Sequence, residues 1–326
     1  MIGIMFQDRL NYRGDLTPVL RSACAAYGIG ELSGHQIIET GYEDCNLKIE
    51  TTAGNYLLKI FSKHRTANEI KRLLIVLERV RLYHIPAPRL YDASGNGILF
   101  RDPGTGLGMV CMDWIDGGTF FELKKTPNDA ELRMVMSALV GMGEIELPDG
   151  TPPMHSEWDI RNLYEMFDRV KGFITNKDEL ELCNYALSEW DKVPVDRLPT
   201  AFCHADIIKQ NCIRGNDGRI YLIDFSLADV MPRIQAASII AYSLLYGNGN
   251  TLLENAAKTI AMYGEYADIT DTERRFFPNY CMAAAAMEYL GSIKEKHIGG
   301  DFRPETDYLI QNGLDGMKSY AGCVAL

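Results

Sequence analysis

Three side chains that can bind a metal ion or move a proton fall within one segment, HADIIKQNCIRGNDGRIYLID, residues 204–224. GNDG is a strong turn sequence between apolar runs, so we expect a β-hairpin with residue 213 opposite about residue 221. That register places Asn211 beside Asp224, whose oxygens are hard ligands of the kind that Mg²⁺ accepts. Asp206 is close enough in the chain to take a proton from a hydroxyl at the same point.

Each of these residues alone is more often a turn or capping residue than a ligand. The complete pattern is H-x-D-x-x-x-x-N, then a hairpin, then Asp-Phe after an apolar strand. This pattern is typical of the catalytic and metal-binding loops of kinase-fold phosphotransferases. It predicts Asp206 as the catalytic base and Asn211 and Asp224 as Mg²⁺ ligands. We expect His204, at the end of a strand, to have an orienting or structural role.

A lysine in an apolar strand is the second feature with chemical meaning. NYLLKIF places Lys59 in the last of several β-rich runs between residues 35 and 61, which predict a small antiparallel meander. A buried lysine is costly without a partner or ligand, so Lys59 is a candidate for binding nucleotide phosphates. The alternative is a lysine on an edge strand that reaches solvent. Gly41, upstream, fits a nucleotide-covering loop, although G-x-G-x-x-G is missing.

The run VCMDWIDGG lies where two lobes would be connected. An extended connection offers free backbone groups to the edge of adenine, which predicts contacts from the carbonyl of Asp113 and the N–H of Ile115. An ordinary strand end followed by a glycine turn explains the same run, and the sequence does not decide between them.

The order of elements predicts an α+β fold of two lobes. Residues 1–115 contain a leading helix, the meander and a second helix near 69–83, with a hinge near 113–118. Residues 116–326 are mainly helical, and strand-like pieces return only at 201–225. A small antiparallel sheet with one main helix, followed by a helical lobe, is therefore expected.

The composition excludes some functions. A formal net charge of -11 and the lack of basic clusters argue against a general nucleic-acid binder. The acidity favours a cationic substrate or reflects solubility alone. The scattered cysteines read as reduced core residues, and neither a signal peptide nor a run of about 20 apolar residues is visible. We therefore expect a cytoplasmic protein without a membrane span.

In its motifs the chain resembles the aminoglycoside phosphotransferase and choline kinase-like superfamily, which has the protein-kinase fold and phosphorylates small molecules. The resemblance rests on GYEDCNLKIETTAGNYLLKIF, IPAPRL, MDWIDG, HADIIKQN and LIDFSLAD. It implies ATP and Mg²⁺ as cofactors, with roles for Asp206, Asn211, Asp224, Lys59 and the hinge as given above. The E-D-x-N loop and T-x-x-G-x-Y-x-L-K look most like the amino-alcohol branch, which includes homoserine and hydroxylysine kinases.

The chain departs from this family at several positions. Ala205 replaces the glycine of H-G-D, which is a mild change if the backbone angle there is ordinary. Lys209 lies where relatives often have proline, and either contacts phosphate or points to solvent. Ala236 takes the place of an aspartate. The helix glutamate that pairs with the strand lysine falls at Leu73, so Glu69, one turn earlier, is the candidate partner of Lys59.

These features predict an ATP-dependent kinase that phosphorylates a hydroxyl of a small, amine-bearing metabolite. The alternative is an inactive kinase-fold protein that binds nucleotide or acts as a scaffold. The acceptor site is expected around HSEWDIRNLYEMFDRVK and FFPNYCMAAAAMEYL, where Glu157, Asp159 and Glu288 are candidates to hold an amine. Solvated charges on amphipathic helices are the alternative for these three acids.

Overall fold

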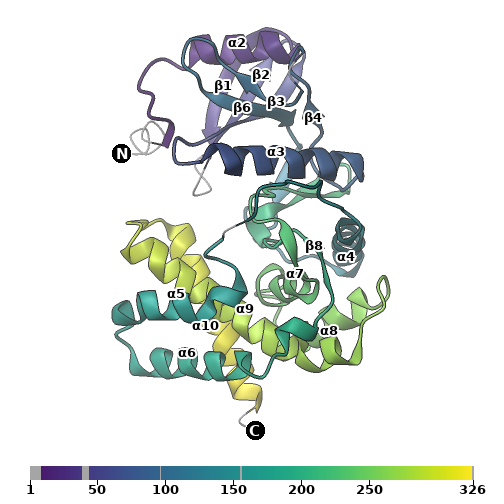
Figure 1. Cartoon of the computed structure of the whole chain (residues 1–326), viewed down its shortest axis with the longest axis vertical. Helices are drawn as coiled ribbons and strands as arrows, with labels where there is room; N and C mark the ends of the chain where they lie inside the picture. The colour runs from purple at the N-terminus through teal and green to yellow at the C-terminus, as the bar shows by residue number, and fades with distance from the viewer. Residues whose placement is uncertain (1–8, 39–43, 96, 155, 325–326) are drawn as a thin grey trace. The chain divides into compact units, whose positions relative to one another are not determined.

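The computed structural model describes residues 9–38, 44–95, 97–154 and 156–324. The chain divides into two compact units (Figure 1). The first comprises Met1–Asp116 and Leu147–Pro153, and the second comprises Gly117–Glu146 and Met154–Leu326. The grouping of the short segment Leu147–Pro153 with the first unit was not expected from the sequence.

The first unit is built on an antiparallel sheet. Its strands lie in the order β1-β2-β3-β6-β4, and β5 pairs with β6. The strand that carries Lys59, β3, is therefore central, with β2 on one side and β6 on the other. The elements are α2 (Thr17–Tyr27), β1 (Leu32–Ile38), β2 (Cys45–Thr51), β3 (Gly54–Ile60), α3 (Ala67–Leu82), β4 (Leu90–Tyr91), β5 (Phe100–Arg101) and β6 (Gly108–Asp113).

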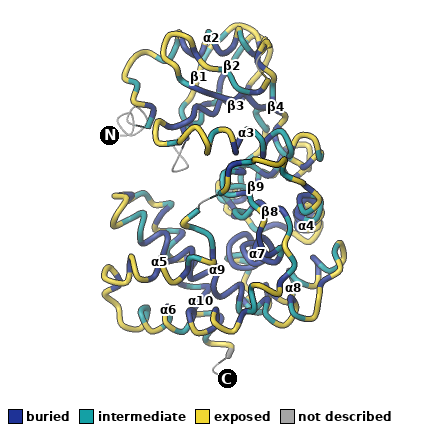
Figure 2. Tube along the Cα trace, in the orientation of Figure 1, coloured by how far each residue is buried: buried dark blue, intermediate teal, exposed yellow. Residues whose placement is uncertain are grey.

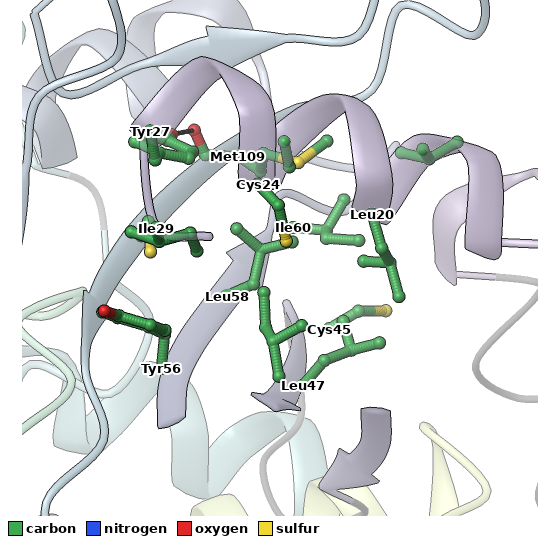
Figure 3. Packing of buried hydrophobic residues seen from close by; sticks show 14 of the residues in the cluster. Leu20, Cys24, Tyr27, Ile29, Cys45, Leu47, Tyr56, Leu58, Ile60 and Met109 are labelled. Atoms are coloured by element: carbon green, nitrogen blue, oxygen red, sulfur yellow. Dashed lines mark hydrogen bonds between the residues drawn. The ribbon is translucent and has the colours of Figure 1, made fainter. Parts of the chain in front are cut away.

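The core of the first unit forms where α2 packs on the sheet (Figure 3). Leu20 and Leu58 are fully buried there, and each such side chain stabilises the fold by about 1.5–3 kcal/mol. The Tyr27 hydroxyl donates to the Met109 carbonyl at 2.7 Å, so the polar end of this buried ring is satisfied. The leading helix and the meander expected from the sequence are thus confirmed.

Helix α3 begins with a capping box. The Thr66 side chain accepts from the Glu69 N–H, and the Glu69 carboxylate accepts from the Thr66 N–H at 2.6 Å. Further along the helix, the buried Arg72 donates to the Pro152 carbonyl at 2.8 Å. This bond explains how residues 147–153 are held in the first unit.

The second unit is mainly helical, and its longest helix, α9, is buried. All residues from Tyr280 to Ile293 in α9 are buried, and Figure 2 shows this part of α9 and the helix α7 in dark blue. A Cβ on Gly313 of α10 would lie 2.6 Å from the Ala285 carbonyl oxygen, so this glycine allows α10 to approach the alanine run of α9. The helices are α4 (Asp129–Gly143), α5 (Leu163–Val170), α6 (Lys177–Trp190), α7 (Ile234–Ile239), α8 (Leu252–Tyr263), α9 (Asp271–His297) and α10 (Pro304–Val324), with a π-helical turn η5 (Ile240–Leu244) and short 3₁₀ turns η1 (Ile160–Asn162), η2 (Lys171–Phe173), η3 (Val195–Arg197) and η4 (Lys209–Asn211).

Two small sheets in this unit carry the motif segment. Strands β10 (Ile220–Leu222), β9 (Cys212–Gly215) and β7 (Gly117–Thr119) form one sheet, and β8 (Thr200–Cys203) pairs with β11 (Asp229–Pro232) in the other. A Cβ on Gly117 would lie 2.2 Å from the Arg214 carbonyl oxygen, so β7 can pair with β9 only with glycine there. No helix in the described part of the chain is long and apolar enough to cross a membrane.

Candidate active site

The hairpin β9–β10 has the register that the sequence predicts. Ile213 pairs with Tyr221, and the Ile223 N–H donates to the Asn211 carbonyl at 3.0 Å. Asn211 therefore lies across from Ile223, directly before Asp224.

Asp206 and Asn211 are joined by their side chains. The Asn211 Nδ2 donates to Asp206 Oδ2 at 2.6 Å and to the Asp206 carbonyl at 3.1 Å. Both side-chain hydrogen bonds of Asn211 among the described residues are donated by Nδ2, so its Oδ1 is available as a ligand. This arrangement holds the base and one metal ligand in fixed relation.

Asp224 has left-handed backbone geometry, with φ 61°. Its Oδ1 accepts hydrogen bonds from the Ser226 N–H at 3.3 Å and from the Ser226 hydroxyl at 2.7 Å. Asp is one of the few residue types that tolerate this conformation, and the turn at Ser226 fixes its carboxylate.

His204 connects the loop that carries Asp206 with the strand end that carries Asp224. It is fully buried, and its Nε2 lies 3.0 Å from the Ile223 carbonyl oxygen, next to Asp224. Burial lowers the pKa of His204 to about 4, so the neutral ring donates Nε2–H to that carbonyl at neutral pH. The structure thus supports an orienting role for His204.

Ala205 has φ 64°, so the condition under which its replacement of glycine would be mild is not met. For a residue with a Cβ, this left-handed conformation costs about 1–2 kcal/mol. The chain therefore carries backbone strain next to Asp206.

Replacing Ala205 by Gly should raise the free energy of unfolding by up to about 1 kcal/mol, because glycine adopts this φ freely but loses more entropy on folding. Urea denaturation measures the change. The matched control is Ala201→Gly in the regular strand β8, which we expect to destabilise the protein by about 0.5–1 kcal/mol. If both variants lost stability equally, strain at Ala205 would be disproved.

One alternative from the sequence, that Lys209 points to solvent, is wrong. It is only 8% exposed, and its Nζ donates to the Tyr246 carbonyl at 2.5 Å, just beyond the π-helical turn η5. A cation at the C-terminal end of a helix interacts favourably with the helix dipole. Lys209 therefore ties the segment between Asp206 and Asn211 to the end of η5.

Lys59 is buried on the central strand β3, which excludes the solvent-facing edge lysine. Among the described residues, the carboxylate within ion-pair distance of its Nζ is that of Asp44, at 3.7 Å. Glu69, the partner expected from the sequence, instead caps its own helix. The interpretation of Glu69 is therefore corrected, while Gly41 lies outside the described residues.

Asp113 ends strand β6, and its carboxylate accepts from the Tyr91 hydroxyl at 2.6 Å. Ile115 follows the strand, and within the described part of the chain its N–H makes no hydrogen bond. The Ile115 N–H suits its predicted contact with adenine, and the contacts of both residues remain a prediction.

The donors present fit Mg²⁺. One carboxylate, on Asp224, and one amide oxygen, on Asn211, come from adjoining strand ends, and Mg²⁺ usually adds water and phosphate oxygens to one or two such ligands. Within the described residues, no group of three or more His, Cys, Asp or Glu side chains could hold a metal ion.

The chain matches the Phosphotransferase enzyme family over residues 35–268. This match covers more than half of the chain and includes the hairpin and Lys59. The chain belongs to this phosphotransferase family. The prediction of the family from its motifs is thereby confirmed.

Two curated relatives of this phosphotransferase family member are homoserine kinases. The chain is 26% identical to that of Sinorhizobium fredii and 27% identical to that of Rhizobium meliloti, over 63% of this chain in both cases. The matches span 61% of the length of each relative.

Solved structures show the same protein-kinase-like fold. A microcompartment-associated aminopropanol kinase matches with TM-score 0.69 and 12% identity, over 94% of this chain and 97% of that one. A spectinomycin phosphotransferase solved with ADP and spectinomycin matches with TM-score 0.67 and 14% identity, over 96% and 100%. The α+β, kinase-like fold class is thus confirmed.

Three acids were predicted from the sequence as candidates to bind an amine of the acceptor. Two of them already have cationic partners in the structure. Glu157 pairs with Lys294 and Arg169, and Asp159 binds the Arg161 guanidinium through both oxygens. Glu288 is different: it is buried, and the Tyr242 hydroxyl donates to its Oε2 at 2.6 Å.

Burial raises the pKa of Glu288 to about 7, and no Lys or Arg in the described residues lies within ion-pair distance of it. Burial raises the pKa of Tyr242, and the charges of Glu288 and Asp206 raise it further, so these three groups share one neighbourhood. Sequence reasoning missed Tyr242 and Asp44. Only the position of Asp44 directly before a strand, beside Lys59 in the meander, could have indicated it.

Proposed function

We propose that this protein is an ATP-dependent phosphotransferase that moves the γ-phosphoryl group to a hydroxyl of a small metabolite. The observation that carries the proposal is the hydrogen-bonded pair Asp206–Asn211, with Asp224 at the adjoining strand end, in a chain of the phosphotransferase family. Phosphoryl transfer needs little covalent chemistry from the protein and depends on positioning and charge neutralisation.

In this proposal Asp206 orients the acceptor hydroxyl and accepts its proton as the new bond between oxygen and phosphorus forms and the bond to ADP breaks. Asn211 Oδ1 and the Asp224 carboxylate hold Mg²⁺, which when bound neutralises charge on the phosphates. Lys59 binds nucleotide phosphates, while the Asp113 carbonyl and Ile115 N–H bind adenine.

The acceptor in this proposal bears an amine. Glu288 is a buried carboxylate without a basic partner among the described residues, in the neighbourhood of Asp206. A buried carboxylate is stabilised by a proton or by a cation, and an ammonium group of the acceptor can supply the cation. The substrates named for two similar proteins, a homoserine kinase and an aminopropanol kinase, are consistent with such an acceptor.

Replacing Glu288 by Gln is expected to raise KM for an amine-bearing acceptor by about 10–100-fold at pH 8, since a charge-assisted hydrogen bond contributes about 1.5–3 kcal/mol. KM for ATP should change little. The matched control is Glu165→Gln, an exposed acid on α5. If the wild type and Glu288→Gln had equal KM values for the acceptor, Glu288 would not be part of the acceptor site.

The pH dependence of stability gives a second readout for the same variant. The carboxyl of Glu288 titrates near 7 when folded, against 4.5 ordinarily, so the folded state binds more protons between these values. Stability from this group is therefore lost as the pH rises from about 4.5 to 7. In Glu288→Gln, this decrease in the free energy of unfolding with rising pH should be absent.

A nucleotide-binding scaffold without turnover is the second candidate, and the strained Ala205 beside Asp206 is the observation that favours it. Purified protein with Mg-ATP and a panel of amino alcohols, hydroxy amino acids, sugars and aminoglycosides separates the two. The enzyme releases ADP only when its acceptor is present. Thermal stabilisation by Mg-ATP without acceptor-dependent ADP release would favour the scaffold.

A further inference from the structure

Lys59 needs an anion to hold it, because an ammonium group buried in a sheet is costly when unpaired. In the family pattern this anion is a glutamate on the helix that follows the strands. Here that position is Leu73, which is apolar and 5% exposed, and Glu69 is engaged in the capping box of α3. Neither α3 position supplies the lysine with its usual partner.

Asp44 lies directly before β2, next to the strand that carries Lys59. Cys45 pairs with Ile60 and Asn46 with Lys59, so Asp44 is adjacent to the lysine in the sheet. Its side chain is 1% exposed, and Oδ2 lies 3.7 Å from Lys59 Nζ. This distance allows an ion pair but is too long for a hydrogen bond.

The Asp44 carboxylate is itself fixed. Arg65 donates from Nε to Oδ1 at 2.7 Å and from Nη2 to Oδ2 at 2.8 Å, and the Ser62 N–H donates to Oδ1 at 3.1 Å. A bidentate guanidinium and a backbone donor prevent the carboxylate from turning. Because Arg65 immediately precedes Thr66, the cap of α3, this contact ties the start of the helix to β2 and β3.

We propose that Asp44, held by Arg65, is the positioning residue for Lys59 and replaces the helix glutamate of the family. The fixed carboxylate keeps the ammonium group in place by charge. In the proposed nucleotide site, the anion that the ammonium group binds is a phosphate of a nucleoside di- or triphosphate. The link between helix and lysine is thus preserved by a different route, from α3 through Arg65 and Asp44 to β3. This inference rests on the proposed nucleotide-binding role of Lys59.

The test is the dissociation constant of Mg-ADP, measured by calorimetry on the full chain. Asp44→Asn keeps the side-chain shape and an acceptor for Ser62, and should weaken Mg-ADP binding by about tenfold or more. With Asp44→Asn, KM for ATP should rise while KM for the acceptor stays near its wild-type value. Glu50→Gln, an exposed acid on β2 in a surface ion pair with Lys48, is the matched control.

Lys59→Met separates failure of this inference from failure of the proposed function. If Lys59→Met weakens Mg-ADP binding and Asp44→Asn does not, the positioning role of Asp44 is overturned. If Lys59→Met also has no effect, the proposed nucleotide site itself is wrong.

Asp44→Glu keeps the test valid if Asp44→Asn does not fold. It retains the charge, so its binding of Mg-ADP should lie within about threefold of the wild type, which corresponds to less than 1 kcal/mol. A loss as large as that of Lys59→Met would show that a carboxylate at this position does not position the lysine, and would overturn the inference.

Discussion

Replacing Asp206 by Asn should lower kcat by about a thousandfold, because the variant cannot accept the proton of the acceptor hydroxyl. The carboxylate oxygen in question accepts a 2.6 Å hydrogen bond from Asn211, which an amide in its place can preserve after rotation. We therefore expect binding of Mg-ATP to remain. Steady-state kinetics with the best acceptor of the panel gives kcat, and calorimetry gives the nucleotide affinity.

Asp217→Asn is the matched control for this substitution. Asp217 is an acid in the turn of the same hairpin, and its carboxylate accepts from the Tyr221 hydroxyl and the Arg219 N–H. Replacing the Asp217 carboxylate by an amide should leave kcat within about twofold of the wild type, as for most surface substitutions. An Asp206→Asn enzyme that retained wild-type kcat would rule out Asp206 as the base.

Replacing Asp224 by Asn is expected to lower kcat/KM for Mg-ATP at least about a hundredfold, because a metal ligand loses its charge. Asn tolerates the left-handed backbone at φ 61°, so the fold should persist. The measurement is the dependence of the initial rate on Mg²⁺ concentration, together with the midpoint of thermal unfolding.

Ser226→Ala is the companion variant for Asp224. It removes the hydroxyl that donates to Asp224 Oδ1 at 2.7 Å while keeping the carboxylate. We expect a smaller loss, of about tenfold, because the ligand is less well oriented but still charged. Wild-type Mg²⁺ dependence in Asp224→Asn would contradict the assignment of Asp224 as a ligand.

The local arrangement around Asp206 was predictable because it depends on short-range rules. A strong turn sequence between two apolar runs fixes the hairpin register, and the register alone places Asn211 beside the strand end at Asp224. The lysine strand was recognised in the same way, from alternation of side chains along β3. Its central position in the sheet follows from the pairing with β6, which the sequence does not encode locally.

Other features depend on backbone angles and on distant partners. The left-handed φ of Ala205 is a property of the folded loop, and an alanine in the sequence gives no sign of it. Lys209 finds its acceptor on Tyr246, 37 residues later. Glu69 was read by helix spacing as a partner for Lys59, whereas the capping motif with Thr66 determines its position.

The acids of the predicted acceptor region were distinguishable only in three dimensions. Glu157 and Asp159 lie just before the turn η1 and are neutralised by nearby basic residues, whereas Glu288 lies in the buried part of α9. Glu288 faces Tyr242, which comes from a different helix 46 residues earlier. When two side chains are this far apart in the sequence, the packing of their helices determines whether they interact.

The proposed phosphoryl transfer from ATP to a hydroxyl can be followed by ³¹P NMR of the wild-type reaction with Mg-ATP and each acceptor of the panel. We predict that one acceptor class gives a phosphomonoester signal that grows as ADP forms, and that Asp206→Asn gives neither. Bound nucleotide with intact ATP and no phosphomonoester for every acceptor would contradict the claim and identify the chain as a nucleotide-binding scaffold.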